Sequence, residues 1–410
     1  MRLQLQQPCP QCGAPVTLWE TDRLLTCSYC GVKSYLLTDG PSRYTLPLGS
    51  RRTGGTRLVH VPYLRFRGAV YDVDSKGVHF RLIDTTKLLY RHELLAPSLG
   101  LRPQAMPLHR LTPQDGGYYI DPTLRLQAVL DSLIRQSGLA DSAPGGFPVL
   151  VGETLSLVYL PLHLDGQRRL ADGVTGTELG VLPPADSLPA RGGPFRQHWQ
   201  VRFLPALCPR CGWNLEGQGD SVVSICPNCL SAYHLNRTGF QAVSWQVATG
   251  RGDLYLPFWR LRCSFPSLSM ASFADFLRLT NQPLLIRKEW GGMELHLWVP
   301  AFRLRPRIFL RLGQQVSVGQ WRLNLADRAY LDNMHPVTLP AGEARQAVRP
   351  ILAAAAVHRK QVLPLAESQP VFTGRPELVF LPCTDRNHDW QQEQTGAVVA
   401  KTILRFGRRL

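Results

Sequence analysis

Cys9-Pro-Gln-Cys12 and Cys27-Ser-Tyr-Cys30 stand near the start of the chain, and the same layout returns as Cys208-Pro-Arg-Cys211 and Cys226-Pro-Asn-Cys229. Both sets have the spacing C-x2-C-x14-C-x2-C, and every cysteine of the second set lies 199 positions after its counterpart. Each C-x2-C pair folds into a tight turn that directs two sulfur atoms to one point, so two pairs can surround one tetrahedral zinc ion. The sequence therefore predicts two zinc sites, whose ligands are Cys9, Cys12, Cys27 and Cys30 in the first and Cys208, Cys211, Cys226 and Cys229 in the second.

We expect both zinc ions to be structural. All four ligands in each set are cysteines, which leaves no open coordination position for water or a substrate. The rest of the chain offers no catalytic pattern, because its eleven histidines are scattered and it contains neither an H-E-x-x-H motif nor a phosphate-binding G-x-x-x-x-G-K loop. The sequence thus predicts a protein that is not an enzyme, with two zinc ions as cofactors, no catalytic residue and no small-molecule substrate.

Three further landmarks occur in both halves of the chain. They are Pro62-Tyr63-Leu64-Arg65-Phe66-Arg67 with Pro257-Phe258-Trp259-Arg260-Leu261-Arg262, Pro97-Ser-Leu-Gly-Leu101-Arg102-Pro103 with Pro300-Ala-Phe-Arg-Leu304-Arg305-Pro306, and Val158-Tyr159-Leu160-Pro161 with Val379-Phe380-Leu381-Pro382. Their offsets are 195, 203 and 221 positions. Together with the repeated cysteines, these landmarks predict a tandem duplication.

The composition favours a mainly β fold with a few helices, because 35 glycines and 33 prolines among 410 residues are typical of many short strands and turns. We expect each half to be a four-cysteine zinc ribbon followed by an antiparallel β domain. The predicted boundaries are 1–38 for the first ribbon, 39–182 for the first β-rich domain, 183–199 for a linker, 200–238 for the second ribbon and 239–410 for the second β-rich domain.

Hydrophobic spacing predicts helices and strands within these domains. Apolar residues recur at helical spacing over residues 121–136, 269–279 and 341–360. Extended patterns cover residues 57–91, 294–299 and 303–312.

Arginine occupies alternate positions of the predicted strands. The residues are Arg65 and Arg67, Arg260 and Arg262, and Arg303, Arg305 and Arg307, and in a strand each set would project from one face. One interpretation is a solvated sheet face whose charges discourage edge pairing. The other is an anion-binding or partner-binding surface, which the net charge of +16 favours because a basic chain attracts nucleic acid, anionic lipid or acidic protein. Both ribbons are nearly neutral and lack the basic residues of a phosphate-binding finger.

The chain carries no pattern of export or of membrane insertion. Its first residues lack the apolar core of a signal peptide, and the most apolar stretch, residues 147–164, is interrupted by Pro148, Glu153 and Pro161. Eight of the ten cysteines stand in C-x2-C pairs, which is the reduced, metal-binding use of cysteine. We therefore expect a cytoplasmic protein without a transmembrane segment, and peripheral contact with a membrane stays open.

A ribbon of the CPxCG type followed by Leu256-Pro257-Phe258-Trp259 resembles a loose set of bacterial zinc-ribbon proteins in which a strand with Pro, an aromatic residue and Trp follows the metal site. The resemblance covers the ribbons and that strand, and the first half departs from it with Leu64 in place of the tryptophan. Members of this set mostly have no assigned function. The resemblance implies a non-enzymatic bacterial protein.

Two functions follow from these patterns. The first is a non-catalytic scaffold or adaptor that mediates protein–protein interaction in a bacterial complex, since two copies of one module present two similar surfaces for bivalent binding. The alternative is a nucleic-acid-binding protein that uses the arginine-rich strand faces. The near-neutral ribbons favour the adaptor.

Overall fold

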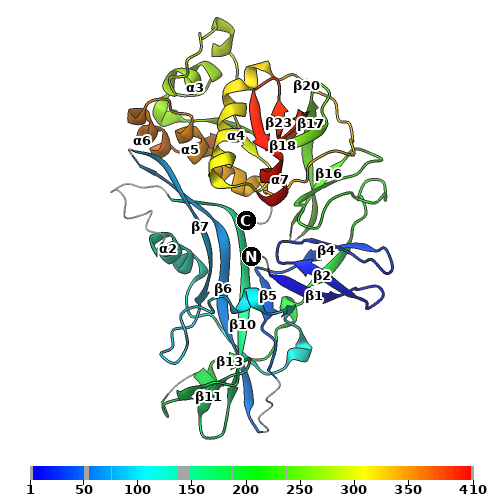
Figure 1. Cartoon of the computed structure of the whole chain (residues 1–410), viewed down its shortest axis with the longest axis vertical. Coiled ribbons are helices and arrows are strands. Elements are labelled where there is room, and N and C mark those ends of the chain that lie inside the picture. The colour runs from blue at the N-terminus through cyan, green and yellow to red at the C-terminus, as the bar shows by residue number, and fades with distance from the viewer. Residues whose placement is uncertain are drawn as a thin grey trace. The chain divides into compact units, whose positions relative to one another are not determined.

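The structure is a computed structural model, which describes residues 3–49, 55–74, 76–136, 148–185, 188–236 and 238–407. Over these residues the protein is mainly β, with strands in three sheets and seven α-helices (Figure 1). None of the helices in these ranges is long and apolar enough to cross a membrane. The expected mainly β class with a few helices is confirmed.

The chain forms two compact units, and each contains one of the cysteine sets. As far as the structure describes them, the first comprises residues 1–67, 83–133 and 153–206, and the second comprises 68–82, 134–152 and 207–410. Of the residues expected to form a linker, 183–199, those that the structure describes, 183–185 and 188–199, belong to the first unit. Trp199 is buried there and packs edge to face on Tyr119, with ring centroids 5.6 Å apart. These described residues are thus part of the first unit, despite the proline and glycine content of the stretch.

The first unit is built from short strands around a few long ones. It contains β1 (Gln4–Pro8), β2 (Pro15–Trp19), β3 (Leu24–Thr26), β4 (Lys33–Leu37), β5 (Ser42–Thr45), α1 (Arg102–Ala105), β8 (Leu108–Arg110), β9 (Tyr118–Ile120), β11 (Arg169–Asp172), β12 (Glu178–Val181), β13 (Gly192–Gly193) and β14 (Arg202–Pro205). Four elements contribute residues to both units, namely β6 (Arg57–Asp74), β7 (Gly77–Leu88), α2 (Leu126–Gln136) and β10 (Val149–Leu164).

Two sheets organise the described part of the first unit. The larger has the order β13-β9-β6-β10-β5-β8-β1-β2, with β7 on β6, β11 on β10 and β12 on β11, and the smaller has the order β14-β4-β3. In β2 the burial alternates with period two, so that Val16 and Leu18 point into the core and Thr17 does not. The central strand β6 is instead buried along almost its whole length, because both of its faces are covered.

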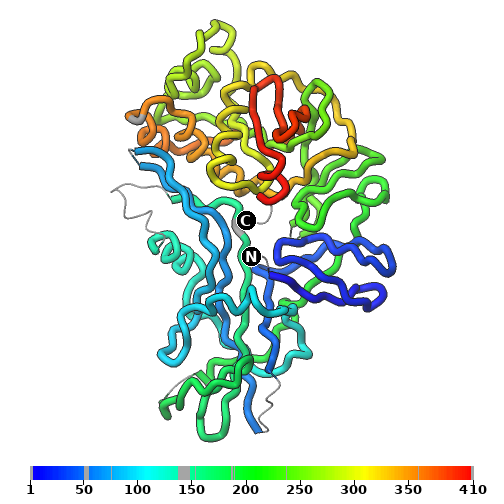
Figure 2. Tube along the Cα trace, viewed as in Figure 1, coloured from blue at the N-terminus to red at the C-terminus, as the bar shows by residue number. Residues whose placement is uncertain are grey.

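The second unit combines one sheet with a group of helices. Its strands are β15 (Val223–Ile225), β16 (Ala232–Asn236), β17 (Gly239–Ala248), β18 (Leu254–Ser264), β19 (His296–Pro300), β20 (Leu325–Ala326), β21 (Val371–Phe372), β22 (Glu377–Arg386), β23 (Asp389–Gln392) and β24 (Ala397–Ala400). Its helices are α3 (Phe273–Leu279), α4 (Pro306–Gly319), α5 (Ala341–Ala354), α6 (Arg359–Glu367) and α7 (Lys401–Gly407). The sheet has the order β15-β16-β17-β22-β18-β19, and residues 207–410 of this unit run from green to red along the tube in Figure 2.

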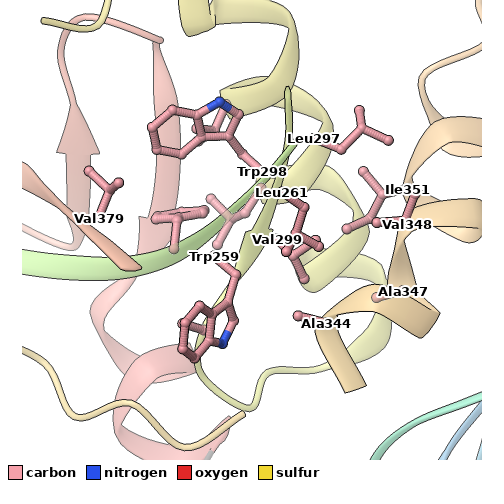
Figure 3. Close-up of a cluster of buried hydrophobic side chains, with 14 of the residues drawn as sticks. Trp259, Leu261, Leu297, Trp298, Val299, Ala344, Ala347, Val348, Ile351 and Val379 are labelled. Atoms are coloured by element: carbon pink, nitrogen blue, oxygen red, sulfur yellow. The ribbon is translucent and has the colours of Figure 1, made fainter. Parts of the chain in front are cut away.

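The core of the second unit forms where α4 and α5 pack on β18 and β19 (Figure 3). The strands contribute the large buried side chains of Trp259, Leu261 and Trp298, whereas α5 presents the small side chains of Ala344 and Ala347 beside Val348 and Ile351. Gly313 of α4 permits a similarly close approach, because a Cβ atom there would lie 2.6 Å from Cδ1 of Ile351. Interlocking large and small residues of this kind gives a densely packed core.

The three predicted helices are present with shifted bounds. Helix α2 begins at Leu126 within the expected 121–136, and α3 begins at Phe273 within the expected 269–279. Ser272 caps α3, since its Oγ accepts a hydrogen bond from the backbone N–H of Asp275 at 3.2 Å. The helix expected over 341–360 is divided into α5 and α6, and the break is held by the N–H of Val357, which donates to the carbonyl of Thr280 at 3.0 Å.

The strand predicted over residues 303–312 is wrong, because most of this stretch belongs to helix α4. The alternating arginines resemble a strand pattern, but Pro306 stands at the first position of α4, where its fixed φ angle and missing N–H suit a helix start. The buried residues of the helix include Phe309, Leu310 and Val316, which lie at helical spacing.

Both units contain the same arrangement of three strands. In the first unit β10 lies between β5 and β6 and pairs in parallel with β5, and in the second unit β22 lies between β17 and β18 and pairs in parallel with β17. The central strands carry the two repeated segments, so that Val158 pairs with Tyr44 and Val379 pairs with Gln246. The corresponding strands occur in the same order along the chain in both halves.

Candidate metal centres

The first cysteine set comes together at the ends of two antiparallel strand pairs. Cys9 and Cys12 lie in the turn from β1 to β2, and Cys27 and Cys30 lie in the turn from β3 to β4. The four Sγ atoms all lie within 4.8 Å of one another, and the Cys9–Cys30 and Cys12–Cys27 pairs are both 3.7 Å apart. Four sulfur atoms at ~2.3 Å from one tetrahedral zinc ion are about 3.8 Å apart. This spacing fits a single zinc ion.

The second set has the same construction. Cys226 and Cys229 lie in the turn between β15 and β16, and Cys208 and Cys211 lie in a turn closed by a bridge between Leu207 and Asn214. The Sγ atoms again lie within 4.8 Å of one another, with 3.5 Å between Cys208 and Cys229 and between Cys211 and Cys226. The sequence prediction that these eight cysteines form two clusters that could each hold a zinc ion is therefore confirmed.

Each Cys-x2-Cys turn is fixed by the same pair of backbone hydrogen bonds. In the first turn the N–H of Gly13 donates to the carbonyl of Cys9 at 2.9 Å, and the N–H of Cys9 donates to the carbonyl of Ala14 at 2.8 Å. The residue after the second cysteine has a left-handed backbone, with φ of +73° at Gly13, Gly31 and Gly212. Glycine adopts this conformation without steric cost, which explains its place in three of the four turns.

The fourth turn uses Leu230 instead of glycine, with φ of +57°. Its carbonyl accepts a hydrogen bond from Nε1 of the fully buried Trp245 at 2.8 Å, and its side chain packs on the core of the second unit. The second cluster is thus tied directly to the main core of its unit. Contact with that core offsets the strain of a left-handed leucine.

Local hydrogen bonds lower the thiol pKa, and so favour the thiolate, at Cys27 of the first cluster and at Cys211 and Cys229 of the second. Backbone hydrogen bonds, led by that of Cys30, lower the pKa of the Cys27 thiol to about 7. The hydrogen bond with the Ser231 hydroxyl lowers the pKa of the Cys229 thiol to about 6. Zinc binds the thiolate, so a lowered thiol pKa reduces the competition from protons.

Both clusters have the chemistry of structural sites. Each offers four sulfur ligands, which complete a tetrahedral zinc shell and leave no position for a substrate or an activated water. Cys9 and Cys27 are buried, as are Cys208 and Cys226, whereas Cys12, Cys30 and Cys211 are exposed. A zinc ion in either cluster would join two strand turns and stabilise the fold.

The structure does not place Arg65 and Arg67 on an exposed sheet face. Only 1 % of Arg65 and 6 % of Arg67 is exposed, and both approach the buried carboxylate of Glu20, at 3.6 and 3.5 Å. Arg65 also forms a short ion pair with Asp84. The physical reason is that β6 is covered on both faces, so its alternate residues do not reach solvent. Glu20 was not identified from the sequence, because nothing local connects the end of β2 with β6.

Desolvation dominates this buried ion cluster. Burial raises the pKa of the Glu20 carboxyl, and the attraction of Arg65 and Arg67 only partly opposes that shift. Burial likewise lowers the pKa of Arg67, against the attraction of Glu20 and Asp84. The cluster is therefore a structural feature of the first unit whose charges depend on one another.

The arginines of the second half are nearer the surface, and two of them pair with carboxylates. Arg260 lies 3.1 Å from Glu377, and Arg262 forms an ion pair with Glu294. Arg303 and Arg305 precede helix α4, and Arg305 is exposed. The predicted arginine residues therefore do not share one surface, since the first pair is buried and the third set lies outside any strand.

Two remaining polar features have structural explanations. Cys263 and Cys383 are buried in β18 and β22, and burial raises the pKa of both thiols to about 12, which makes them poor nucleophiles. Asp385 belongs to the β22–β23 hairpin, and both of its carboxylate oxygens bind Nζ of Lys401. Neither arrangement provides a nucleophile with a positioned base.

Comparison of the chain with protein-family models, with curated proteins and with solved structures finds no significant match.

Proposed function

We propose that the protein is a non-catalytic zinc-binding adaptor that holds protein partners in a bacterial complex. The observation that carries this proposal is an exposed aromatic side chain beside each cysteine cluster. Tyr29, between Cys27 and Cys30, is 71 % exposed, and Trp213, two positions after Cys211, is 57 % exposed. Tyrosine and tryptophan are enriched at the centres of protein interfaces, where they supply most of the binding energy.

A tandem duplication supports bivalent binding. Strands β5, β6 and β10 have the same arrangement as β17, β18 and β22. A duplication of one ancestral module would produce this correspondence. Pro62 and Pro257 lie in the corresponding strands β6 and β18, and Pro161 and Pro382 lie in β10 and β22. The third pair does not correspond in this way, because Pro300 ends β19 whereas Pro97 lies outside a strand. Two related modules, each with an exposed aromatic beside its cysteine cluster, would give avidity for a partner with two sites.

The cytoplasm is the compartment that fits this role. Zinc needs the cysteines as thiolates, which a reducing compartment maintains, and the resemblance to bacterial zinc-ribbon proteins favours a bacterial complex. The alternative function, nucleic-acid binding, is favoured by the net charge of +16 and by the exposed Arg305 and Arg307 at the start of α4. It has less support, because the arginines of β6 and β18 pair with carboxylates.

Alanine at both ribbon aromatics should remove partner binding. Tagged protein carrying Tyr29→Ala and Trp213→Ala should recover its native partner from extract at least roughly tenfold less well than wild type, since an interface hot spot contributes about 2 kcal/mol or more. Wild-type binding should survive nuclease treatment and about 0.5 M salt, because apolar contacts are not screened. The measurement is quantitative affinity purification, with Leu285→Ala as control, since Leu285 is 91 % exposed but distant in sequence from both clusters.

Nucleic-acid binding would give the opposite pattern. The recovered material would disappear with nuclease, duplex DNA would bind with submicromolar affinity that falls steeply with salt, and Arg305→Gln with Arg307→Gln would weaken that binding. An adaptor instead binds duplex DNA only weakly, at roughly 1 to 100 micromolar at physiological salt. Equal partner recovery by the wild type and the Tyr29→Ala, Trp213→Ala variant would contradict the role given to the ribbon aromatics.

A further inference from the structure

A cavity of about 600 Å³ lies in the second unit between the β16–β17 hairpin and the start of helix α5. Its lining includes three arginines, Arg328, Arg345 and Arg375, and no aspartate or glutamate among the residues that the structure describes. These arginines come from three separate segments of the chain, and all are exposed to solvent. A cavity of this size accommodates a small organic molecule.

Among the residues that the structure describes, neither Arg345 nor Arg375 forms an ion pair with a carboxylate, and the carboxylates of the neighbouring elements have other partners. Glu377 lies 3.1 Å from Arg260, and Glu343 accepts a hydrogen bond from the N–H of Gly152 at 2.6 Å. The guanidinium of Arg345 lies over the ring of Phe372, 5.1 Å from its centre, which holds the arginine in place and leaves its N–H groups for another partner. Arg375 follows Gly374 in the loop between β21 and β22.

Arg328 has a different environment from the other two. Its Nε donates to the carbonyl of Trp245 at 3.1 Å, and it also borders a neighbouring cavity that contains Asp327 and Glu377. Arg345 and Arg375 are therefore the residues that can best contact an anion in the larger cavity.

Backbone N–H groups add hydrogen-bond donors at the cavity, next to Glu343 in the first turn of α5. Helix α5 has 14 residues and begins at the cavity with Ala341 and Gly342, after Pro340, which supplies no side-chain cap. The first N–H groups of a helix have no partner within the helix, and the helix dipole favours an anion there. A Cβ atom at Gly342 would have no neighbour within 4 Å, so the space beside these N–H groups is open.

The cavity also has apolar walls. Val243 of β17 and Pro340 contribute to its lining, and Trp259 closes it from the side of β18, with its Nε1 already bound to the carbonyl of Leu339 at 2.8 Å. We propose that this cavity binds a small organic anion, whose phosphate or carboxylate group contacts Arg345 and Arg375 and whose apolar body lies against Val243 and Pro340. This site is independent of the adaptor role proposed for the ribbons.

Binding of simple aromatic anions to the whole 410-residue chain, loaded with zinc, tests the proposal. Phenyl phosphate and benzoate carry the two candidate charged groups on an apolar ring, and phenol is their neutral counterpart. By isothermal titration calorimetry, at least one of the two anions should bind at a single site with a Kd on the order of a millimolar or tighter. Phenol should bind at least roughly tenfold more weakly, because charge-assisted hydrogen bonds to arginine are lost.

Substitutions inside and outside the cavity lining test where the anion binds. Arg345→Gln with Arg375→Gln should weaken the anion roughly tenfold or more, whereas Arg251→Gln with Lys360→Gln should leave its affinity unchanged, since these exposed cations lie outside the cavity lining. Gly342→Glu should also abolish binding by placing a carboxylate among the arginines, without lowering the melting temperature, because an acidic side chain is favourable in the first turn of a helix. The proposal is overturned if neither anion binds the wild type, if phenol binds equally well, or if both double variants behave alike.

Discussion

Replacing Cys208 by alanine is expected to unfold the second zinc ribbon and to lower the stability of the second unit by several kcal/mol. A structural zinc ion in a four-ligand site has an apparent binding free energy of about 10–16 kcal/mol, which is of the same order as the whole stability of a domain, about 5–15 kcal/mol. The loss should spread beyond the ribbon, because β16 pairs with β17 along the whole length of β16. Thermal unfolding together with the zinc content of the purified variant measures the effect.

Cys263→Ala is the matched control for this substitution. Cys263 is as buried as Cys208 but lies in β18 and belongs to neither cluster, so its loss removes a small apolar side chain and no metal ligand. It should cost about 1 kcal/mol and keep the full zinc content. Equal melting temperatures for the two variants, with zinc retained in both, would show that the second cluster is not a structural metal site.

Removing the Glu20 carboxylate is expected to have the second largest effect. The Glu20→Ala variant leaves Arg65 and Arg67 buried without the carboxylate that both approach, while Asp84, whose side chain is 30 % exposed, still pairs with them. Breaking a buried ion pair by deleting one partner costs about 3–5 kcal/mol, because the remaining charge stays desolvated. Urea unfolding of the first unit should therefore show a clear fall in stability.

The surface pair of Arg260 and Glu377 provides the comparison. Its two side chains are 26 % and 40 % exposed, so Glu377→Ala should cost no more than about 1 kcal/mol. A double-mutant cycle between Glu20 and Arg65 should give a coupling energy. Replacing Arg65 should destabilise the protein less in the Glu20→Ala background than in wild type, because in that background Arg65 has already lost this partner. If Glu20→Ala and Glu377→Ala destabilise equally, the cluster around Glu20 contributes no more than a solvent-screened surface pair.

The metal clusters could be predicted from the sequence because their geometry is local. Two residues between the cysteines of each pair, followed by glycine in three of the four turns, are enough to set the turn that directs the sulfur atoms. The mainly β fold class could also be predicted, from the glycine and proline content and from the alternating apolar residues. None of these predictions requires knowledge of the contacts between segments that are distant in the sequence.

The predicted exposure of Arg65 and Arg67 is wrong, because exposure depends on contacts between segments that are distant in the sequence. Whether Arg65 reaches solvent depends on what covers β6, and Glu20 and Asp84 come from elements that no local pattern relates to that strand. At residues 303–307 the alternation of arginine predicts a strand, whereas Pro306 and the spacing of the following apolar residues fit the helix that the structure shows. The cavity beside α5 is likewise invisible in the sequence, because Arg328, Arg345 and Arg375 come together only through the fold.

The zinc content of the purified chain is the most direct test of the central claim that this chain is a two-site zinc protein. Elemental analysis by mass spectrometry, normalised to protein concentration, should give two zinc ions per chain. Alanine at Cys9 should reduce this to one, as should alanine at Cys208, because the two clusters share no ligand. A wild-type content of one zinc ion or none would contradict the account.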